Sequence, residues 1–185
     1  MLGTPMQVVE TVTFLEMTSP ARLSPGRPAP APVEVDEVGE ASASLLRLTF
    51  ERIGAPYNWQ IRRTGSDAWS DEQWAERLSE PGVHAWLARV TGEIAGMVEV
   101  EAQPGGDVEI VVFGLAPEFV GKGFGAHLLA VATRLAWRTE PLDGVPIRRV
   151  WLHTSSRDHP HALPNYRRRG FRLFRTEQGP REILT

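Results

Sequence analysis

Residues 115–126 read LAPEFVGKGFGA and join an apolar, strand-like segment to an amphipathic helical one. Three glycines, Gly121, Gly123 and Gly125, stand at alternate positions at the mouth of the predicted helix. Glycine leaves the backbone N–H groups unhindered, and the helix dipole adds its attraction for negative charge. The stretch therefore predicts a phosphate cradle and chemistry that uses a phosphorylated cofactor.

Composition predicts one globular domain with a full core, because the chain has 185 residues of which 42% are hydrophobic. The net charge of −3 favours neither nucleic acid nor an anionic membrane as a partner. Cysteine is absent, which excludes disulfides, thiolate nucleophiles and cysteine-ligated zinc. No apolar run approaches the roughly 20 residues that span a bilayer, so we expect an unexported, cytoplasmic protein.

The first part of the chain mixes short strands and helices with a proline-rich spacer. Residues 7–17 predict a strand, and residues 19–32 predict an extended polyproline segment, so this strand is expected on a stiff tether, capping the edge of its own or a partner's sheet. A strand over 33–38 and a helix over 41–53 follow, the helix burying Leu45, Leu46, Leu48 and Phe50. Ser70 and Gln73 have capping-box spacing and begin the next helix.

The second part predicts an antiparallel meander followed by alternating helices and strands. Short turns separate strands over 83–90, 94–101 and 108–115; then come a helix over 124–138, a strand over 149–154, a helix over 162–169 and a strand over 171–176. This order indicates an α/β fold with a central mixed, mostly antiparallel sheet of about six to seven strands and about four flanking helices.

Spacing separates three kinds of glycine-rich phosphate loop. A P-loop needs Ser or Thr after its Gly-Lys pair, but Gly123 follows Lys122. A Rossmann fingerprint needs its third glycine three residues after the second and a parallel strand next, whereas here the glycines alternate after a meander. Neither loop fits this chain.

The segment from Val120 to Gly125 resembles the coenzyme A motif of the GNAT N-acetyltransferase superfamily, Arg/Gln-x-x-Gly-x-Gly/Ala, with Val120 in place of the usual Arg or Gln. Residues 162–171, ALPNYRRRGF, resemble the second hallmark of the family, and the resemblance covers about residues 33–176. The resemblance implies an acyltransferase domain over 33–178; around it we expect an extra strand over 1–18, a linker over 19–32 and a tail over 179–185. The family sheet splays between its fourth and fifth core strands.

The resemblance also implies acetyl-CoA as co-substrate. Its pantetheine arm would lie along Phe113, Gly114 and Leu115, with Gly114 permitting a bulge that causes the splay. Its pyrophosphate would rest on the backbone of the glycine loop, which comprises Val120, Gly121, Lys122, Gly123, Phe124, Gly125 and Ala126. His159 falls where many relatives carry an Asn near the amide of the cofactor.

Tyr166 is the candidate general acid, because a phenol with a pKa of about 10 can give a proton to a departing thiolate. The alternative is a tyrosine that only packs in the core. Glu109 is the candidate base, since strand alternation places it on one face with Val111, Phe113 and Leu115, and burial there raises the pKa of a carboxyl group. The alternative is a glutamate paired with an arginine near the end of the sheet.

Two further groups of residues bear on the site. Tyr57, Trp59 and Trp69 lie in the early half of the chain, where the family places its acceptor entrance, although three such aromatics can also be core. His153, Asp158, His159 and His161, with Ser155 and Ser156, invite comparison with a metal site or a serine triad. Their spacing matches no common zinc signature, so we expect no metal.

Together these features predict an enzyme that passes an acetyl group from acetyl-CoA directly to the amine of a small molecule. An acetyltransferase of protein lysines or N-termini and a non-catalytic sensor of acyl-CoA are the alternatives. The sequence leaves open whether the protein forms a homodimer.

Overall fold

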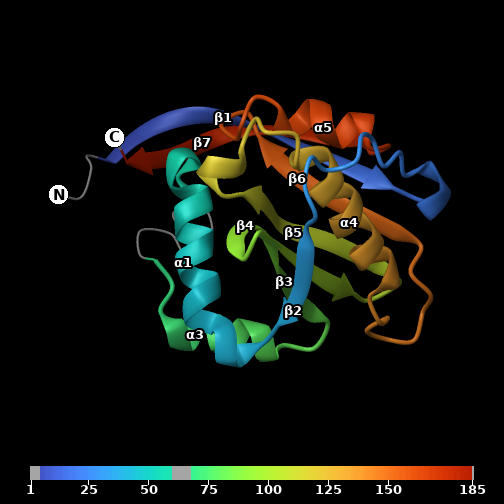
Figure 1. Ribbon diagram of the computed structural model, residues 1–185. Coiled ribbons are helices and arrows are strands. Elements are labelled where there is room, and N and C mark those ends of the chain that lie inside the picture. Colours follow the sequence, from blue (N-terminus) through green and yellow to red (C-terminus); the bar gives the residue numbers. More distant parts are fainter. Residues whose placement is uncertain (1–4, 60–67, 185) are drawn as a thin grey trace.

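Seven strands form one mixed sheet in the computed structural model, which describes residues 5–59 and 68–184 (Figure 1). The strands lie in the order β2-β3-β4-β5-β6-β1-β7, and among the described strands only β5 and β6 pair in parallel. Their bounds are β1 Pro5–Met17, β2 Glu34–Val38, β3 Val83–Val90, β4 Glu93–Gln103, β5 Asp107–Leu115, β6 Arg149–Ser155 and β7 Arg172–Leu184. The predicted mixed, mostly antiparallel sheet is confirmed.

Helices cover both faces of the sheet. In the described part of the chain they are α1 Ala43–Gly54, α3 Asp71–Ser79, α4 Gly125–Arg138 and α5 Ala162–Arg168. Figure 1 shows α1 and α3 to one side of β4 and β5, and α4 to the other. The core is divided accordingly: Leu46 and Trp74 lie in one cluster with Met97, whereas Leu129 lies in the other with Val100.

Local sequence signals set where α3 begins and which face of α1 is buried. The predicted capping box is present, since the Ser70 hydroxyl accepts from the Gln73 N–H and the Gln73 side chain accepts from the Ser70 N–H. In α1, however, Leu45 and Leu48 are 37% and 52% exposed, so their predicted burial is wrong. The buried stripe of α1 runs through Leu46 and Phe50 and continues to Ile53, because positions four and seven apart share one helix face.

The N-terminal strand lies inside the sheet and does not cap an edge of it. β1 pairs with β6 along one side, over Val12–Met17, and with β7 along the other, over Pro5–Glu16. Its Leu15 and Met17 side chains are fully buried on the face that α4 and α5 cover. The expected edge strand is therefore wrong: over residues 12–16 both hydrogen-bonding edges of β1 are paired within this chain.

The proline-rich spacer is packed against the domain and is not a free tether. Its Ser24 N–H donates to the Arg169 carbonyl at 3.0 Å, and Ala29 and Ala31 pack against the cluster that contains Phe124. Pro30 lies beside the glycine loop, with its Cδ 3.7 Å from where a Cβ on Gly123 would stand. The spacer thus runs from the end of α5 to the start of α4.

The sheet opens between β5 and β6, the fourth and fifth strands in its order, as predicted. Their pairing ends at Glu109 and Trp151. Just beyond, β5 carries a bulge at Val111, because Val100 pairs with Ile110 while its neighbour Glu99 pairs with Val112. A bulge reverses the alternation of side chains along a strand. Glu109 therefore shares a face with Val112, and its predicted place beside Phe113 and Leu115 is wrong.

Candidate active site

A cavity of about 190 Å³ fills the opening between β5 and β6. β5 contributes four successive residues after its pairing with β6 ends, β6 contributes two, and the remaining lining comes from α1, α5, the segment that follows α1 and the loop after β6. The lining residues are Phe50, Trp59, Ile110, Val111, Val112, Phe113, Leu152, His153, Asp158 and Tyr166. The site is thus an apolar and aromatic chamber with a few groups that can exchange protons.

Tyr166 lines this cavity from α5. Its ring is buried, edge-on to Phe113 at 6.3 Å and to Phe171 at 6.5 Å. The preceding residue, Asn165, donates from its side chain to the carbonyl of Gly125 at 3.1 Å, which ties α5 to the first turn of α4. The two sequence motifs are therefore joined in space, and the tyrosine is held at a defined distance from the glycine loop.

Glu109 lies at the base of the opening and does not line the cavity. One of its carboxylate oxygens accepts from the Gln103 side chain at 3.2 Å, and the other is 3.3 Å from Nδ1 of His153. His153, which sequence reasoning set aside with the loop histidines, does line the cavity. The only signal for it in the sequence was its place on the strand that follows the glycine helix.

The glycine loop is shaped to receive an anion. Gly121 and Gly123 have φ angles of 76° and 91°, which side chains rarely adopt, and nothing lies within 4 Å of where a Cβ on Gly121 would stand. Within the described chain, no backbone carbonyl accepts from the N–H groups of Gly121, Gly123, Phe124 or Gly125. The Lys122 N–H, in contrast, turns back to the Phe119 carbonyl at 3.4 Å. The loop thus fits a diphosphate group such as that of coenzyme A.

The edge of β5 fits the arm of the same cofactor, because its backbone beyond Glu109 has no paired residue on β6. Phe113 lines the cavity there, while Leu115 packs into the α4 core. Gly114 has a different role from the one expected. The bulge lies at Val111, and a Cβ on Gly114 would stand 2.4 Å from Ile53, so this glycine lets α1 approach the strand.

Of the three aromatic residues predicted for the acceptor entrance, Trp59 lines the cavity, and Tyr57 packs beside it at 5.9 Å. Burial and the Asp158 carboxylate both raise the pKa of the Tyr57 phenol. Trp69 instead packs on Trp74 at 5.6 Å, in the core under α1 and α3.

A buried arginine on β7 holds this wall in place. Arg181 donates to the carbonyls of Tyr57 and Asn58, at 3.1 and 2.8 Å, and pairs with the Glu10 carboxylate of β1 at 2.7 Å. The strands at both ends of the chain therefore position the segment that carries Trp59.

The loop after β6 is organised by hydrogen bonds of Asp158. Its carboxylate accepts from the Thr154 hydroxyl, the Ser155 N–H and the indole N–H of Trp59, at 2.8, 2.8 and 3.0 Å. The Ser155 hydroxyl donates to Glu10, an arrangement that does not match a serine triad. His159 lies edge-on to Tyr57 at 6.5 Å. Among the residues that the structure describes, no group of three potential metal ligands gathers.

The family model described as the acetyltransferase (GNAT) family matches residues 50–171 of the chain. No curated protein sequence matches significantly. Within the described residues, no helix is both long and apolar enough to cross a bilayer.

Solved structures share the fold at low sequence identity. A GCN5-related N-acetyltransferase from Kribbella flavida is 20% identical, with a TM-score of 0.61 over 94% of this chain and 58% of that one. A second, from Sphaerobacter thermophilus, is 21% identical, with a TM-score of 0.62 over 96% of this chain and 53% of that one. This chain thus spans little more than half the length of either protein. An acetyltransferase from Thermus thermophilus is 20% identical, with a TM-score of 0.55 over 82% of this chain and 97% of that one.

Proposed function

Because the chain belongs to the acetyltransferase (GNAT) family, we propose that it transfers an acetyl group from acetyl-CoA directly to the amine of a small molecule. One observation supports this most: Tyr166 and His153 line one cavity beside the middle of β5, the strand that leads into the glycine loop. A donor bound along this strand would carry its reactive end into the cavity and leave its phosphates at the helix.

The donor supplies an activated thioester. The chain's part at this end is to hold the cofactor phosphates on the N–H groups of the glycine loop and the arm along the free edge of β5. Tyr166 is our general acid: its phenol would protonate the sulfur as the C–S bond breaks. Its ring is buried edge-on to Phe113 and Phe171, and these contacts support it beside the cavity.

The size and lining of the cavity favour a small amine over a protein surface as the acceptor. A volume of about 190 Å³, with Phe50, Trp59 and Phe113 in its wall, suits a compact amine with an apolar portion. Direct transfer is favoured over a covalent cysteinyl enzyme because the chain contains no cysteine.

A thiol-release assay with acetyl-CoA against small amines, aminoglycosides, polyamines and peptides tests the proposal. We expect release with at least one small amine, and a loss of about 10²- to 10⁴-fold in kcat for Tyr166→Phe with unchanged coenzyme A affinity. Release only with peptides would favour a protein acetyltransferase. Stabilisation of the protein by acetyl-CoA, without thiol release in the presence of any amine, would favour a sensor. Unchanged turnover in Tyr166→Phe would show that Tyr166 is not the general acid.

A further inference from the structure

We propose that His153 takes the proton from the attacking amine and that Glu109 acts only through it, as a positioning residue. The inference rests on the proposed acetyl transfer and names the base for that reaction. It starts from the observation that the strand opening exposes the histidine to the cavity while it keeps the glutamate outside.

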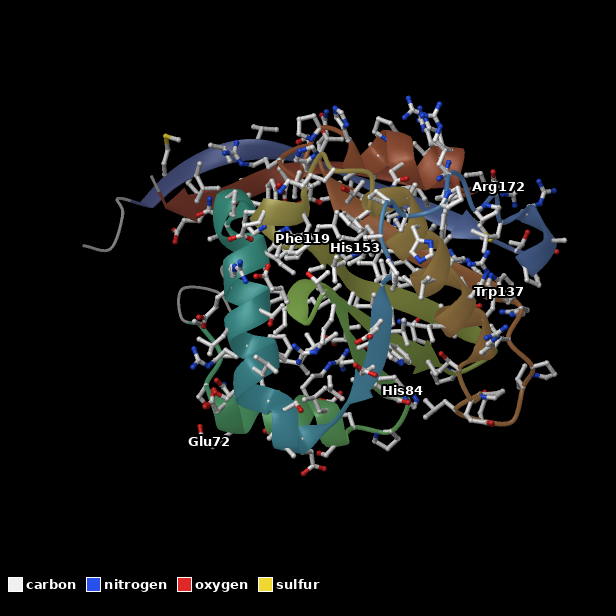
Figure 2. All side chains as sticks on the ribbon, viewed as in Figure 1. Glu72, His84, Phe119, Trp137, His153 and Arg172 are labelled. Carbon is white, nitrogen blue, oxygen red and sulfur yellow. The ribbon has the colours of Figure 1, made fainter. Side chains whose placement is uncertain are left out.

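His153 stands where a base must stand. It lies on β6, two residues beyond the last pairing with β5, and shares the cavity wall with Tyr166. Figure 2 labels it in the central part of the view, apart from His84. A base and an acid in one chamber are what a transfer between two bound partners requires.

The ring of His153 is held in one orientation. It packs on Phe14 at 5.6 Å and on Trp151 at 6.3 Å, from β1 and from its own strand. Its Nδ1 faces the Glu109 carboxylate at 3.3 Å, within ion-pair distance but not aligned as a hydrogen bond. Contacts of this kind in free enzymes often tighten when substrate binds. Nε2 is then the ring nitrogen left for the amine.

Glu109 is built to support this ring. Its second carboxylate oxygen accepts from the side-chain amide of Gln103, and the oxygen of that same amide accepts from the Trp151 indole N–H at 3.0 Å. These two hydrogen bonds fix the Glu109 carboxylate beside His153, and the Glu109 side chain is only 13% exposed. A carboxylate so placed favours the Nδ1–H tautomer, which leaves Nε2 as acceptor, and stabilises the imidazolium that forms.

The proton count of the step balances. As the amine nitrogen bonds to the acetyl carbon, one proton passes from that nitrogen to Nε2 of His153, and one passes from the Tyr166 phenol to the departing sulfur. Solvent later takes the first proton from His153 and restores the second to Tyr166.

The charged and titratable groups around the His153 ring come from several elements. They are Glu109 from β5, Asp158 from the loop after β6, Tyr166 from α5, and Arg175 and Arg149, which stack on Phe14 and Trp151.

The test compares pH profiles of kcat/KM for the wild type, His153→Gln and Glu109→Gln, together with the double variant. His153→Gln should lose about 10²- to 10⁴-fold and the rise in rate from acid to neutral pH. Glu109→Gln should lose on the order of tenfold, through a less well positioned ring, and keep that rise. The double variant should be no worse than His153→Gln.

The chain offers a matched control in a second histidine–glutamate pair. His84 Nδ1 lies 2.7 Å from the Glu37 carboxylate on β3 and β2, outside the cavity lining. His84→Gln and Glu37→Gln should leave the profile unchanged. Imidazole should restore part of the rate to His153→Ala and none to Glu109→Ala. This rescue tests the role of the ring even if the His153→Gln variant is less stable than the wild type.

Three results would overturn the inference: a profile of His153→Gln that keeps its rise, a Glu109→Gln variant that loses its rise while His153→Gln does not, and no rescue by imidazole. A non-activity readout accompanies these. The ring-nitrogen NMR signals of His153 should show the Nδ1–H tautomer in the wild type and lose that preference in Glu109→Gln. If the wild type itself acetylates no amine, the proposed function fails, a result distinct from all of these.

Discussion

Replacing Gly121 by Ala separates the binding role of the glycine loop from its cost in folding, because the chain contains a natural control. Gly121 and Gly144 both have a φ of 76°, and nothing lies within 4 Å of a Cβ built on either. Each substitution therefore costs only the left-handed backbone strain, about 1–2 kcal/mol. For a chain of this size both variants should lose about 2–8 °C in melting temperature.

Only Gly121→Ala should weaken coenzyme A binding. The Gly121 N–H is free of any backbone carbonyl in the described chain, and a strained loop no longer aims it and its neighbours at the phosphates. Losing one hydrogen bond to a charged group costs about 1.5–3 kcal/mol, which corresponds to a rise in Kd of about 10- to 100-fold. Titration calorimetry with coenzyme A measures this directly, and thermal unfolding without ligand measures the shared cost.

The pattern of the two variants decides the matter. If Gly121→Ala melts earlier by the same amount as Gly144→Ala and binds coenzyme A as tightly as the wild type, the glycine serves only the turn. If Gly144→Ala weakens binding equally, the effect is a general loosening of the fold. Either outcome refutes the cradle.

Three further predictions concern stability and ionisation. Arg181→Met should lower the free energy of unfolding in urea by about 3–5 kcal/mol, because it removes the Arg181 cation that pairs with the largely buried Glu10 carboxylate; a loss below about 1 kcal/mol contradicts this. Burial raises the pKa of Glu16, but hydrogen bonds from two arginines outweigh it and hold that pKa below its usual value. The ionised Glu16 carboxylate therefore stabilises the fold above its unfolded pKa, and this stabilisation is lost as the pH falls through its folded pKa. Between about pH 6 and pH 3, the unfolding free energy of Glu16→Gln should drop less than that of the wild type. With Tyr166→Phe, Tyr57 is the one remaining tyrosine, and its ultraviolet titration should have its midpoint above the usual value of about 10, owing to burial and a nearby carboxylate.

Local sequence signals were enough for most of the elements. The capping box of Ser70 and Gln73, the glycine-rich entry to α4 and the turns of the meander are all formed by residues close in the chain. Such signals act through backbone dihedral angles and neighbouring hydrogen bonds, which a sequence displays directly. The two family motifs were also legible, although their contact through Asn165 was not.

The site was harder to predict, because its residues meet through sheet geometry. A single bulge at Val111 reversed the face on which Glu109 had been placed, and nothing in the local sequence marks that extra residue. His153 became a candidate base only because the parallel pairing ends at Trp151 and the cavity opens there.

The sequence by itself predicted the donor side that we propose for this protein: a glycine loop at a helix start, where backbone conformation alone can make an anion site. Only the tertiary structure suggested the acceptor side and the proton path that we propose, and it placed β1 between β6 and β7. Those features depend on strand pairing and register between distant segments, and register sets the side of a sheet on which each side chain lies.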